Sequence, residues 1–171
     1  MDDPLTDHHC ASEQDIFYLQ AEWVFVADAV MGGVSRGGLQ QTDVAGRQSA
    51  RLTGSVSLEN DGGFLQMAFD LAGGAVFDAS RFKGLCLDVW GNDQNYDLRL
   101  RTDYLRKPWQ SYRATFQARS AWHRVTLPFE AFLPNKTELP LNPARLRRVG
   151  VLAIGRVFSA DVAVARIGFY A

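Results

Sequence analysis

The residues with the clearest capacity for chemistry lie in one short segment, Asp28-Ala29-Val30-Met31-Gly32-Gly33-Val34-Ser35. Asp28 and Ser35 can accept hydrogen bonds from backbone N–H groups and so hold a turn in place. The two adjacent glycines indicate a sharp bend or a close approach to another group. Met31 is either a plug into the core or a soft contact for a partner. The segment therefore predicts a shaped loop that could form a binding site.

A second segment, Glu59-Asn60-Asp61-Gly62-Gly63-Phe64, places a carboxylate beside residues that tolerate positive φ. Such residues favour a tight hairpin, which we expect between Val56–Leu58 and Phe64–Met67. Glu59 either accepts hydrogen bonds from the loop at Asp28 or is a surface carboxylate at the end of a strand. As a pair, Asp28 and Glu59 could act as acid and base only within about 10 Å of each other. Catalysis by this pair is therefore our third hypothesis, after two hypotheses in which the protein only binds a partner or a ligand.

The side chains that usually serve as nucleophiles, general bases or metal ligands are few: His8, His9, Cys10, Cys86 and His123. The first three lie in a polar N-terminal stretch and lack the spacing of a zinc site. We expect Cys86 to be a small buried apolar residue and His123 a structural histidine within a strand. The Gly-rich run Met31–Gly38 has neither the Lys-Ser/Thr ending of a P-loop nor the spacing of a dinucleotide site. The sequence thus predicts no catalytic set, no metal and no cofactor.

Arginines form a third group of candidates, on two strands expected over Tyr96–Thr102 and Ser111–Gln117. Because side chains alternate along a strand, Arg99, Arg101 and Arg113 point away from the core, and they share one sheet face if the strands pair. A basic face with aromatic neighbours could bind nucleic acid, but the near-neutral chain without a known motif favours a solvated face. Three aromatic side chains could instead stack on sugar rings, namely Trp90, Tyr104 and Trp109.

The composition is that of one globular domain, with 171 residues of which 47% are hydrophobic and 22% charged. Charge is uneven, since residues 1–80 hold 3 Lys/Arg against 12 Asp/Glu, and residues 81–148 hold 13 against 6. This asymmetry favours charged partners unless the segments interleave in the fold and cancel. No apolar run approaches the ~20 residues that span a bilayer, and the acidic start does not resemble a targeting peptide. We therefore expect a cytoplasmic protein without membrane insertion and without a nucleic-acid partner.

The elements that must position these residues are short strands with alternating apolar and polar side chains, separated by turn residues. This pattern predicts an all-β fold, an antiparallel β-sandwich. The expected strands are Glu22–Ala27, Ser49–Glu59, Gly63–Leu71, Leu85–Gly91, Tyr96–Thr102, Ser111–Gln117, Trp122–Leu127, Val149–Ile154 and Val162–Tyr170.

The remaining segments are expected to be irregular. Residues 1–15 are polar and acidic and predict an N-terminal arm, before a single domain over residues 16–171. Residues 16–19 could form a short helical turn or an edge segment. Leu133–Arg148 contains three prolines and cannot be a central strand, so we expect a long loop with one helical turn starting at Asn142-Pro143.

Taken together, these residues resemble a known family. The signature stretches are Asp28-x-x-Met31-Gly32-Gly33-x-Ser35 and Gly54-x-Val56-Ser57-Leu58-Glu59-Asn60-x-Gly62-Gly63-Phe64, followed by blocks at Gly84-Leu85, Gly91-Asn92-Asp93, Arg99-Leu100-Arg101, Tyr112-x-Ala114-x-Phe116 and Trp122-x-x-Val125-x-Leu127-Pro128. They are similar to the complex I intermediate-associated protein 30 domain family, over roughly residues 23–170.

The resemblance implies a jelly roll of the galactose-binding-like kind and a role without catalysis. The expected function is a binding module that holds a protein partner, such as an assembly intermediate, by analogy with respiratory complex I assembly factors. The alternative is a module for carbohydrate or another small polar ligand. Galactose-binding-like domains sometimes carry a structural calcium, although no acidic cluster in this sequence calls for one.

Overall fold

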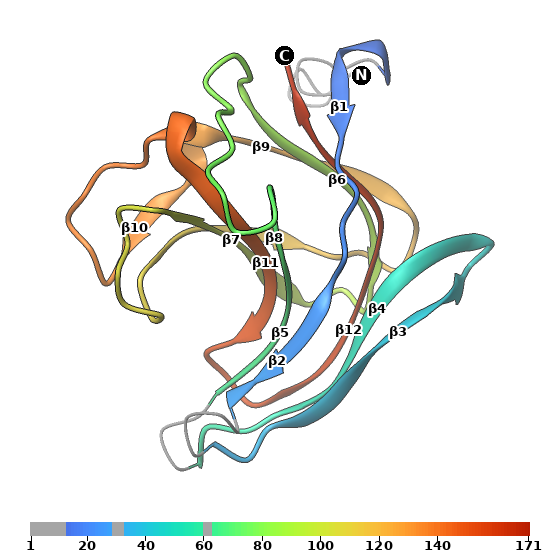
Figure 1. The fold of residues 1–171 in the computed structure, drawn as a ribbon. Helices are drawn as coiled ribbons and strands as arrows, with labels where there is room; N and C mark the ends of the chain where they lie inside the picture. The colour runs from blue at the N-terminus through green and yellow to red at the C-terminus, as the bar shows by residue number, and fades with distance from the viewer. Residues whose placement is uncertain (1–12, 29–32, 60–62) are drawn as a thin grey trace, which may run out of the picture.

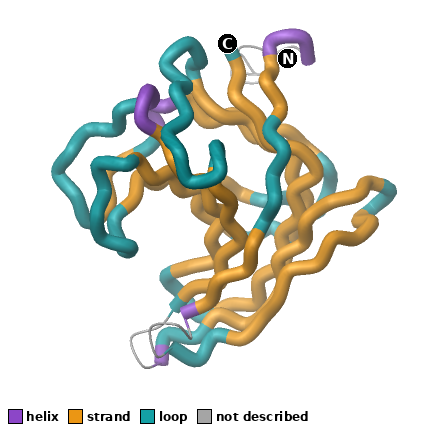
Figure 2. Tube along the Cα trace, viewed as in Figure 1, coloured by secondary structure: helices purple, strands orange, loops and turns teal. Residues whose placement is uncertain are grey.

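The computed structural model describes residues 13–28, 33–59 and 63–171, and these form two antiparallel sheets packed face to face (Figures 1 and 2). Sheet A has the order β3-β4-β12-β6-β9, and β1 also pairs with β12. Its strands are β1 (Ile16–Tyr18), β3 (Arg36–Val44), β4 (Arg47–Val56), β6 (Gly84–Gly91), β9 (His123–Pro128) and β12 (Phe158–Tyr170).

Sheet B has the order β10-β8-β7-β11-β5-β2. Its strands are β2 (Val24–Ala27), β5 (Phe64–Asp70), β7 (Asn95–Thr102), β8 (Ser111–Gln117), β10 (Leu133–Asn135) and β11 (Leu146–Ile154). Three 3-10 turns complete the described elements, η1 (Glu13–Asp15), η4 (Phe129–Ala131) and η5 (Pro143–Arg145). The expected all-β antiparallel sandwich is confirmed, and no described helix is long and apolar enough to cross a membrane.

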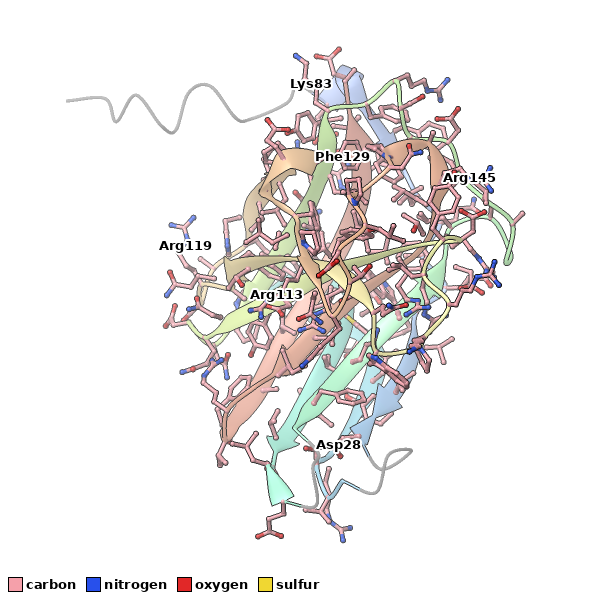
Figure 3. The ribbon with its side chains drawn as sticks, turned by 90° about the vertical axis from the view of Figure 1, so that its left-hand side faces the viewer. Asp28, Lys83, Arg113, Arg119, Phe129 and Arg145 are labelled. Carbon is pink, nitrogen blue, oxygen red and sulfur yellow. The ribbon has the colours of Figure 1, made fainter. Side chains whose placement is uncertain are left out.

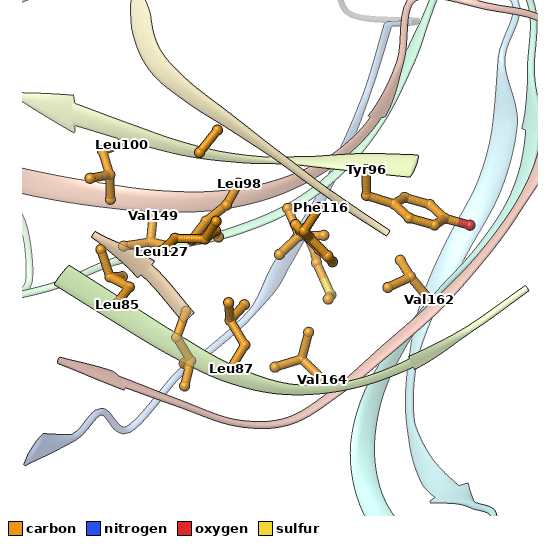
Figure 4. Close-up of a cluster of buried hydrophobic side chains, with 14 of the residues drawn as sticks. Leu85, Leu87, Tyr96, Leu98, Leu100, Phe116, Leu127, Val149, Val162 and Val164 are labelled. Carbon is orange, nitrogen blue, oxygen red and sulfur yellow. The ribbon is translucent and has the colours of Figure 1, made fainter. Parts of the chain in front are cut away.

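The core lies between the two sheets and is built by alternation along the central strands. Leu85 and Leu87 of β6 are buried against residues that β7 turns inward, among them Leu98 and Leu100 (Figure 4). Val89 of β6 belongs to the same buried cluster. Full burial of each leucine contributes about 1.5–3 kcal/mol to the free energy of unfolding. The other half of each strand, residues 97, 99 and 101 of β7 for example, therefore faces outward.

The prediction of a hairpin between Val56–Leu58 and Phe64–Met67 is wrong. β4 lies in sheet A, where it pairs with β3 and β12, whereas β5 lies in sheet B, where it pairs with β11 and β2. The chain therefore crosses from one sheet to the other between these strands. The tight hairpin of this region joins β3 to β4, and its two turn residues, Ala45 and Gly46, both have positive φ, 45° and 88°.

The other strands begin and end close to the residues expected from the sequence, with local exceptions. β1 is the edge segment that was one of the two alternatives for residues 16–19. The strands β3 and β10 were not expected, although β10 is an edge strand, as its proline requires. β11 begins at Leu146, inside the stretch expected to be a loop. The helical turn at Asn142-Pro143 is confirmed as η5, and the Asn142 side chain accepts a hydrogen bond from the N–H of Ala144.

Of the N-terminal arm expected over residues 1–15, residues 1–12 lie outside the described part of the chain. Residues 13–15 form η1, which is held on sheet A by Glu13. The carboxylate of Glu13 pairs with Arg124 at 2.8 Å and Arg166 at 2.9 Å, and accepts a hydrogen bond from the hydroxyl of Tyr18 at 2.5 Å. Hydrogen bonds from Tyr18 and Arg124 lower the pKa of Glu13 to about 2.

Candidate functional site

Asp28 stands at the end of β2 and is fully buried, at the lower end of the sandwich in Figure 3. Its Oδ1 accepts the N–H of Ser35 at 3.0 Å, and its Oδ2 accepts the N–H of Gly63 at 2.5 Å, the N–H of Phe64 at 3.2 Å and the hydroxyl of Ser35. Burial raises the pKa of Asp28, but these hydrogen bonds outweigh it and leave the pKa below its usual value. Asp28 is therefore an ionised structural acceptor.

The two glycine segments thus meet in space, as expected, and Ser35 extends the contact. Its Oγ accepts the N–H of Ser57 at 2.9 Å, while its single hydroxyl hydrogen is donated to Asp28. A Cβ atom added to Gly33 would lie 2.6 Å from Oδ1 of Asp28, so only glycine fits there. We call this group of Asp28, Gly33, Ser35, Ser57 and Gly63 the latch.

The structure assigns the acceptor role to Asp28 rather than to Glu59. Glu59 is exposed, and its N–H donates to the hydroxyl of Ser57 at 3.2 Å. The acid and base pair considered for an enzyme is thus split between a buried acceptor with four donors and an exposed side chain. Four further candidates, Met31, Gly32, Asn60 and Gly62, lie outside the described residues.

A cleft of about 1040 Å³ opens on the outer face of sheet B. Side chains from β2, β5, β7, β8, β10 and β11 line it, together with the loop that carries Trp109, and we call it the arginine cleft. Its described lining contains one carboxylate, Asp97, and these basic side chains: Arg99, Arg101, Arg113, Lys136, Arg148 and Arg156. Arg113 projects from the middle of the face turned to the viewer in Figure 3.

Arg99 and Arg113 stand directly opposite each other on β7 and β8, so the two strands do pair, which was the condition for their arginines to share one face. Asp97 lies between them and joins Nη2 of Arg99 at 2.9 Å and Nε of Arg113 at 3.4 Å. It also accepts the hydroxyl of Thr115 at 3.0 Å. The Asp97 side chain is only 5% exposed, against 45% for Arg113. The buried carboxylate therefore holds both guanidinium groups in place from the side of the sheet, while Arg113 faces the solvent.

Arg101 has a structural task at the rim of the arginine cleft. Its guanidinium donates to the backbone carbonyls of Leu105, Lys107, Pro108 and Gln110, at 2.6–3.2 Å. Burial lowers the pKa of Arg101, and the neighbouring charges of Arg148 and Arg147 lower it further. Arg101 thus holds the loop that presents Trp109, whose side chain is 54% exposed.

The three aromatic candidates do not share one site. Trp109 lines the arginine cleft, whereas Trp90 belongs to sheet A, where the guanidinium of Arg51 lies 5.4 Å from its ring centroid. Tyr104 is half exposed beneath Arg145 and is not among the residues that line the cleft. Sequence reasoning missed the contributions of β5 and β11, such as Gln66 and Arg148, because these strands join β7 only through long-range pairing.

The family model of complex I intermediate-associated protein 30 (CIA30) matches residues 12–162, most of the chain. The chain belongs to the CIA30 family. Its latch is made from both segments that carried the resemblance, and the fold is the jelly-roll sandwich that the resemblance implied. No curated protein is similar enough in sequence to count as a match.

Solved structures similar to this CIA30-family chain include carbohydrate-binding modules. One is a family 11 module from Clostridium thermocellum in complex with a β-1,3-1,4-mixed-linked tetrasaccharide, with 11% identity, 91% of this chain and 95% of that chain covered, and a TM-score of 0.71. Another is a family 30 module of a cellulosomal cellulase of Clostridium thermocellum, with 12% identity, coverage of 91% and 90%, and a TM-score of 0.60. At these identities the similarity concerns the fold.

Proposed function

We propose that this CIA30-family protein is a non-catalytic binding module, and that the arginine cleft binds its ligand, a carbohydrate chain. The observation that carries the proposal is the cleft itself, which crosses sheet B and is lined by side chains from each of its strands. Large concave surfaces of this kind are the usual sites of ligand binding. The CIA30 family and the folds similar to this chain are of a binding type, which supports a role without catalysis.

The lining of the arginine cleft suits the hydroxyl groups of sugars. Amide side chains both donate and accept hydrogen bonds, and four of them line the cleft: Gln66, Asn95, Gln110 and Asn135. Trp109 offers an exposed ring on which an apolar sugar face can stack. The similar family 11 module was solved with a bound tetrasaccharide, which supports a sugar chain as the ligand class here.

The test is a glycan array followed by calorimetric titration of the best ligand against Trp109→Ala, with Trp90→Ala as the matched control. Both changes remove a partly exposed tryptophan, but only Trp109 lines the arginine cleft. We expect Trp109→Ala to weaken binding about tenfold or more, because it removes the aromatic ring on which a sugar would stack, and Trp90→Ala to leave it unchanged. A folded protein that binds no glycan would refute the proposal.

A second candidate function is binding of a protein partner, such as an assembly intermediate, at the latch. Membership of the CIA30 family favours it, and so do Val34 and Leu58, two apolar side chains beside the latch that are 37% and 49% exposed. The variant Val34→Ser with Leu58→Ser removes this apolar surface without touching Asp28, and since Leu58 also lines the arginine cleft, glycan binding of the variant is measured alongside. Unchanged recovery of partners by the folded double variant would exclude this surface as the contact. Substitution of Gly33 is unsuitable, because it would disturb Asp28 and report on stability.

A further inference from the structure

We infer that the arginine cleft selects an anionic carbohydrate chain, one that carries carboxylate or sulfate groups, and that Arg113 contacts those groups. The inference rests on the proposed function, since it names the ligand class of the same cleft. It is carried by the juxtaposition of two opposed arginines, a buried carboxylate that orients them, and further basic side chains around them.

The charge that the cleft presents to a ligand is positive. Six basic side chains line it against one lining carboxylate, Asp97, which is almost fully buried and already bonded to Arg99, Arg113 and Thr115. Arg148 is paired at 2.9 Å with Asp70, which is not part of the lining, so the excess of positive charge lies with the other basic side chains. A ligand in the cleft therefore meets guanidinium and ammonium groups rather than carboxylate oxygens. A neutral sugar gains little from such an excess, whereas a carboxylate or sulfate forms charge-assisted hydrogen bonds with it.

Without a bound ligand, the opposed pair Arg99 and Arg113 lowers the stability of the folded protein. Like charges that stand directly opposite on antiparallel strands destabilise a sheet, and Arg99 and Arg113 occupy such positions. One carboxylate between two guanidinium groups leaves one positive charge uncompensated. Burial is the main cause of the lowered pKa of Arg101, and the nearby charge of Arg148, which also lines the cleft, lowers it further. A bound anion would relieve this repulsion.

Arg113 has the geometry to contact the anion. Within the described contacts it gives its Nε to Asp97 at 3.4 Å, which leaves its outer amino groups for a ligand. Planar guanidinium groups bind carboxylates and sulfates through two parallel hydrogen bonds. Arg101 does not share this role, because its guanidinium is occupied by backbone carbonyls.

A carbohydrate fits the cleft better than an acidic peptide does. Extended peptides usually bind to a sheet through a free strand edge, where backbone groups pair. The arginine cleft instead lies on the face of sheet B, where side chains point outward and the strand backbones are already paired with each other. The amide side chains beside the arginines complement sugar hydroxyls as well as anionic groups.

The experiment titrates the full chain with four probes of similar length: an oligogalacturonide, a sulfated galactan oligosaccharide, a neutral mixed-linked β-glucan oligosaccharide and poly-L-glutamate. We expect one of the two anionic sugars to bind about tenfold or more tighter than the neutral one at about 0.05 M salt, with the advantage shrinking at about 0.5 M. The carboxylated and sulfated arms identify which anion is preferred.

Three variants distinguish the loss of the positive charge of Arg113 from a general loss of structure. We expect Arg113→Gln to weaken binding of the preferred anionic sugar about tenfold and Arg113→Lys to weaken it less, because lysine keeps the charge. Arg119→Gln, an exposed arginine outside the cleft lining, serves as the control and should bind normally. Thermal melting confirms that each variant is folded.

Equal binding of neutral and anionic sugars, or an unaffected Arg113→Gln variant, would overturn the inference while the proposed function stands. Binding of poly-L-glutamate alone would overturn both, and would point to an acidic peptide as the ligand. Binding of none of the four probes, together with a silent glycan array, would also overturn both.

Discussion

At the residue scale, the two acidic side chains of the glycine segments have different roles. Asp28 is buried and ties β2, the start of β3 and the start of β5 together through four donors. Glu59 is exposed. The sequence identified both segments and their proximity, but residue type alone could not tell which carboxylate would be the acceptor, because that depends on burial.

Replacement of Asp28 by alanine should destabilise the fold strongly. The change leaves the N–H groups of Ser35, Gly63 and Phe64 without their acceptor in a buried place. We expect a loss of about 3 kcal/mol or more in the free energy of unfolding, measured by urea denaturation. Glu59→Gln is the control and should stay within about 0.5 kcal/mol of the parent. Equal stability of the two variants would contradict the structural role of Asp28.

The stability conferred by Asp28 should depend on pH. Its pKa in the folded state lies below the value of about 3.9 that it has in an unfolded chain. A lowered pKa contributes stability that is complete above the unfolded value and is lost as pH falls through that value toward the folded one. We therefore expect the difference in unfolding free energy between the parent and Asp28→Asn to narrow below about pH 4. Denaturation curves at several pH values measure it, and a constant difference would exclude ionisation as the cause.

At the element scale, β3 and β4 approach each other closely at Gly37 and Gly54, which are register partners. A Cβ on Gly37 would collide with the carbonyl oxygen of Thr53 and lie 3.0 Å from Leu65, whereas a Cβ on Gly38 would meet nothing within 4 Å. Adjacent glycines on one strand thus differ in what they tolerate. The contact with Leu65 brings sheet B against this hairpin.

Gly37→Ala and Gly38→Ala make a matched pair for this contact. We expect Gly37→Ala to cost about 1–3 kcal/mol through overpacking against backbone that cannot move away easily. We expect Gly38→Ala to be neutral or to stabilise by up to about 1 kcal/mol, because alanine restricts the unfolded chain. Thermal melting of both variants checks this, and similar melting temperatures would refute the close approach.

A second prediction at this scale concerns the loop that carries Trp109. Arg101 donates hydrogen bonds to four backbone carbonyls of this loop, and lysine cannot reproduce this set of hydrogen bonds. We expect Arg101→Lys to accelerate amide hydrogen exchange in residues 103–110 while β6 and β12 keep their protection. Arg106→Lys, an exposed change in the same loop, is the control. Unaltered exchange in the Arg101 variant would show that other contacts hold the loop.

The strands that the sequence predicted well are those with strong alternation. β8 matches its expected range from Ser111 to Gln117, and the outward arginines follow from the same parity. β3 was missed because its two glycines have low β propensity, and its two adjacent glutamines interrupt the alternation of apolar and polar residues. The supposed hairpin after Val56 failed for a different reason. Turn residues show that a chain bends, not which sheet it enters next.

At the scale of the whole molecule, the candidate site is a product of long-range pairing. The arginine cleft joins strands that lie far apart along the chain, such as β5 and β8 on either side of β7 and β11. Alternation in single strands correctly placed Arg99 and Arg113 on one face, but it could not show that Trp90 belongs to the opposite sheet. The uneven charge of the sequence also survives folding here, since basic side chains from β7, β8 and β11 gather in one cleft.

The latch also has a consequence for the rate at which the protein unfolds. The chain crosses between the sheets from β2 to β3 and again from β4 to β5, and one carboxylate is bonded to both crossings. Its hydrogen bonds with Gly63 and Phe64 span more than 30 residues of sequence, so we expect them to form late in folding, once both crossings are in place. Contacts that are completed after the folding barrier act mainly on unfolding. Asp28 is thus expected to govern how long the native domain persists more than how quickly it is reached.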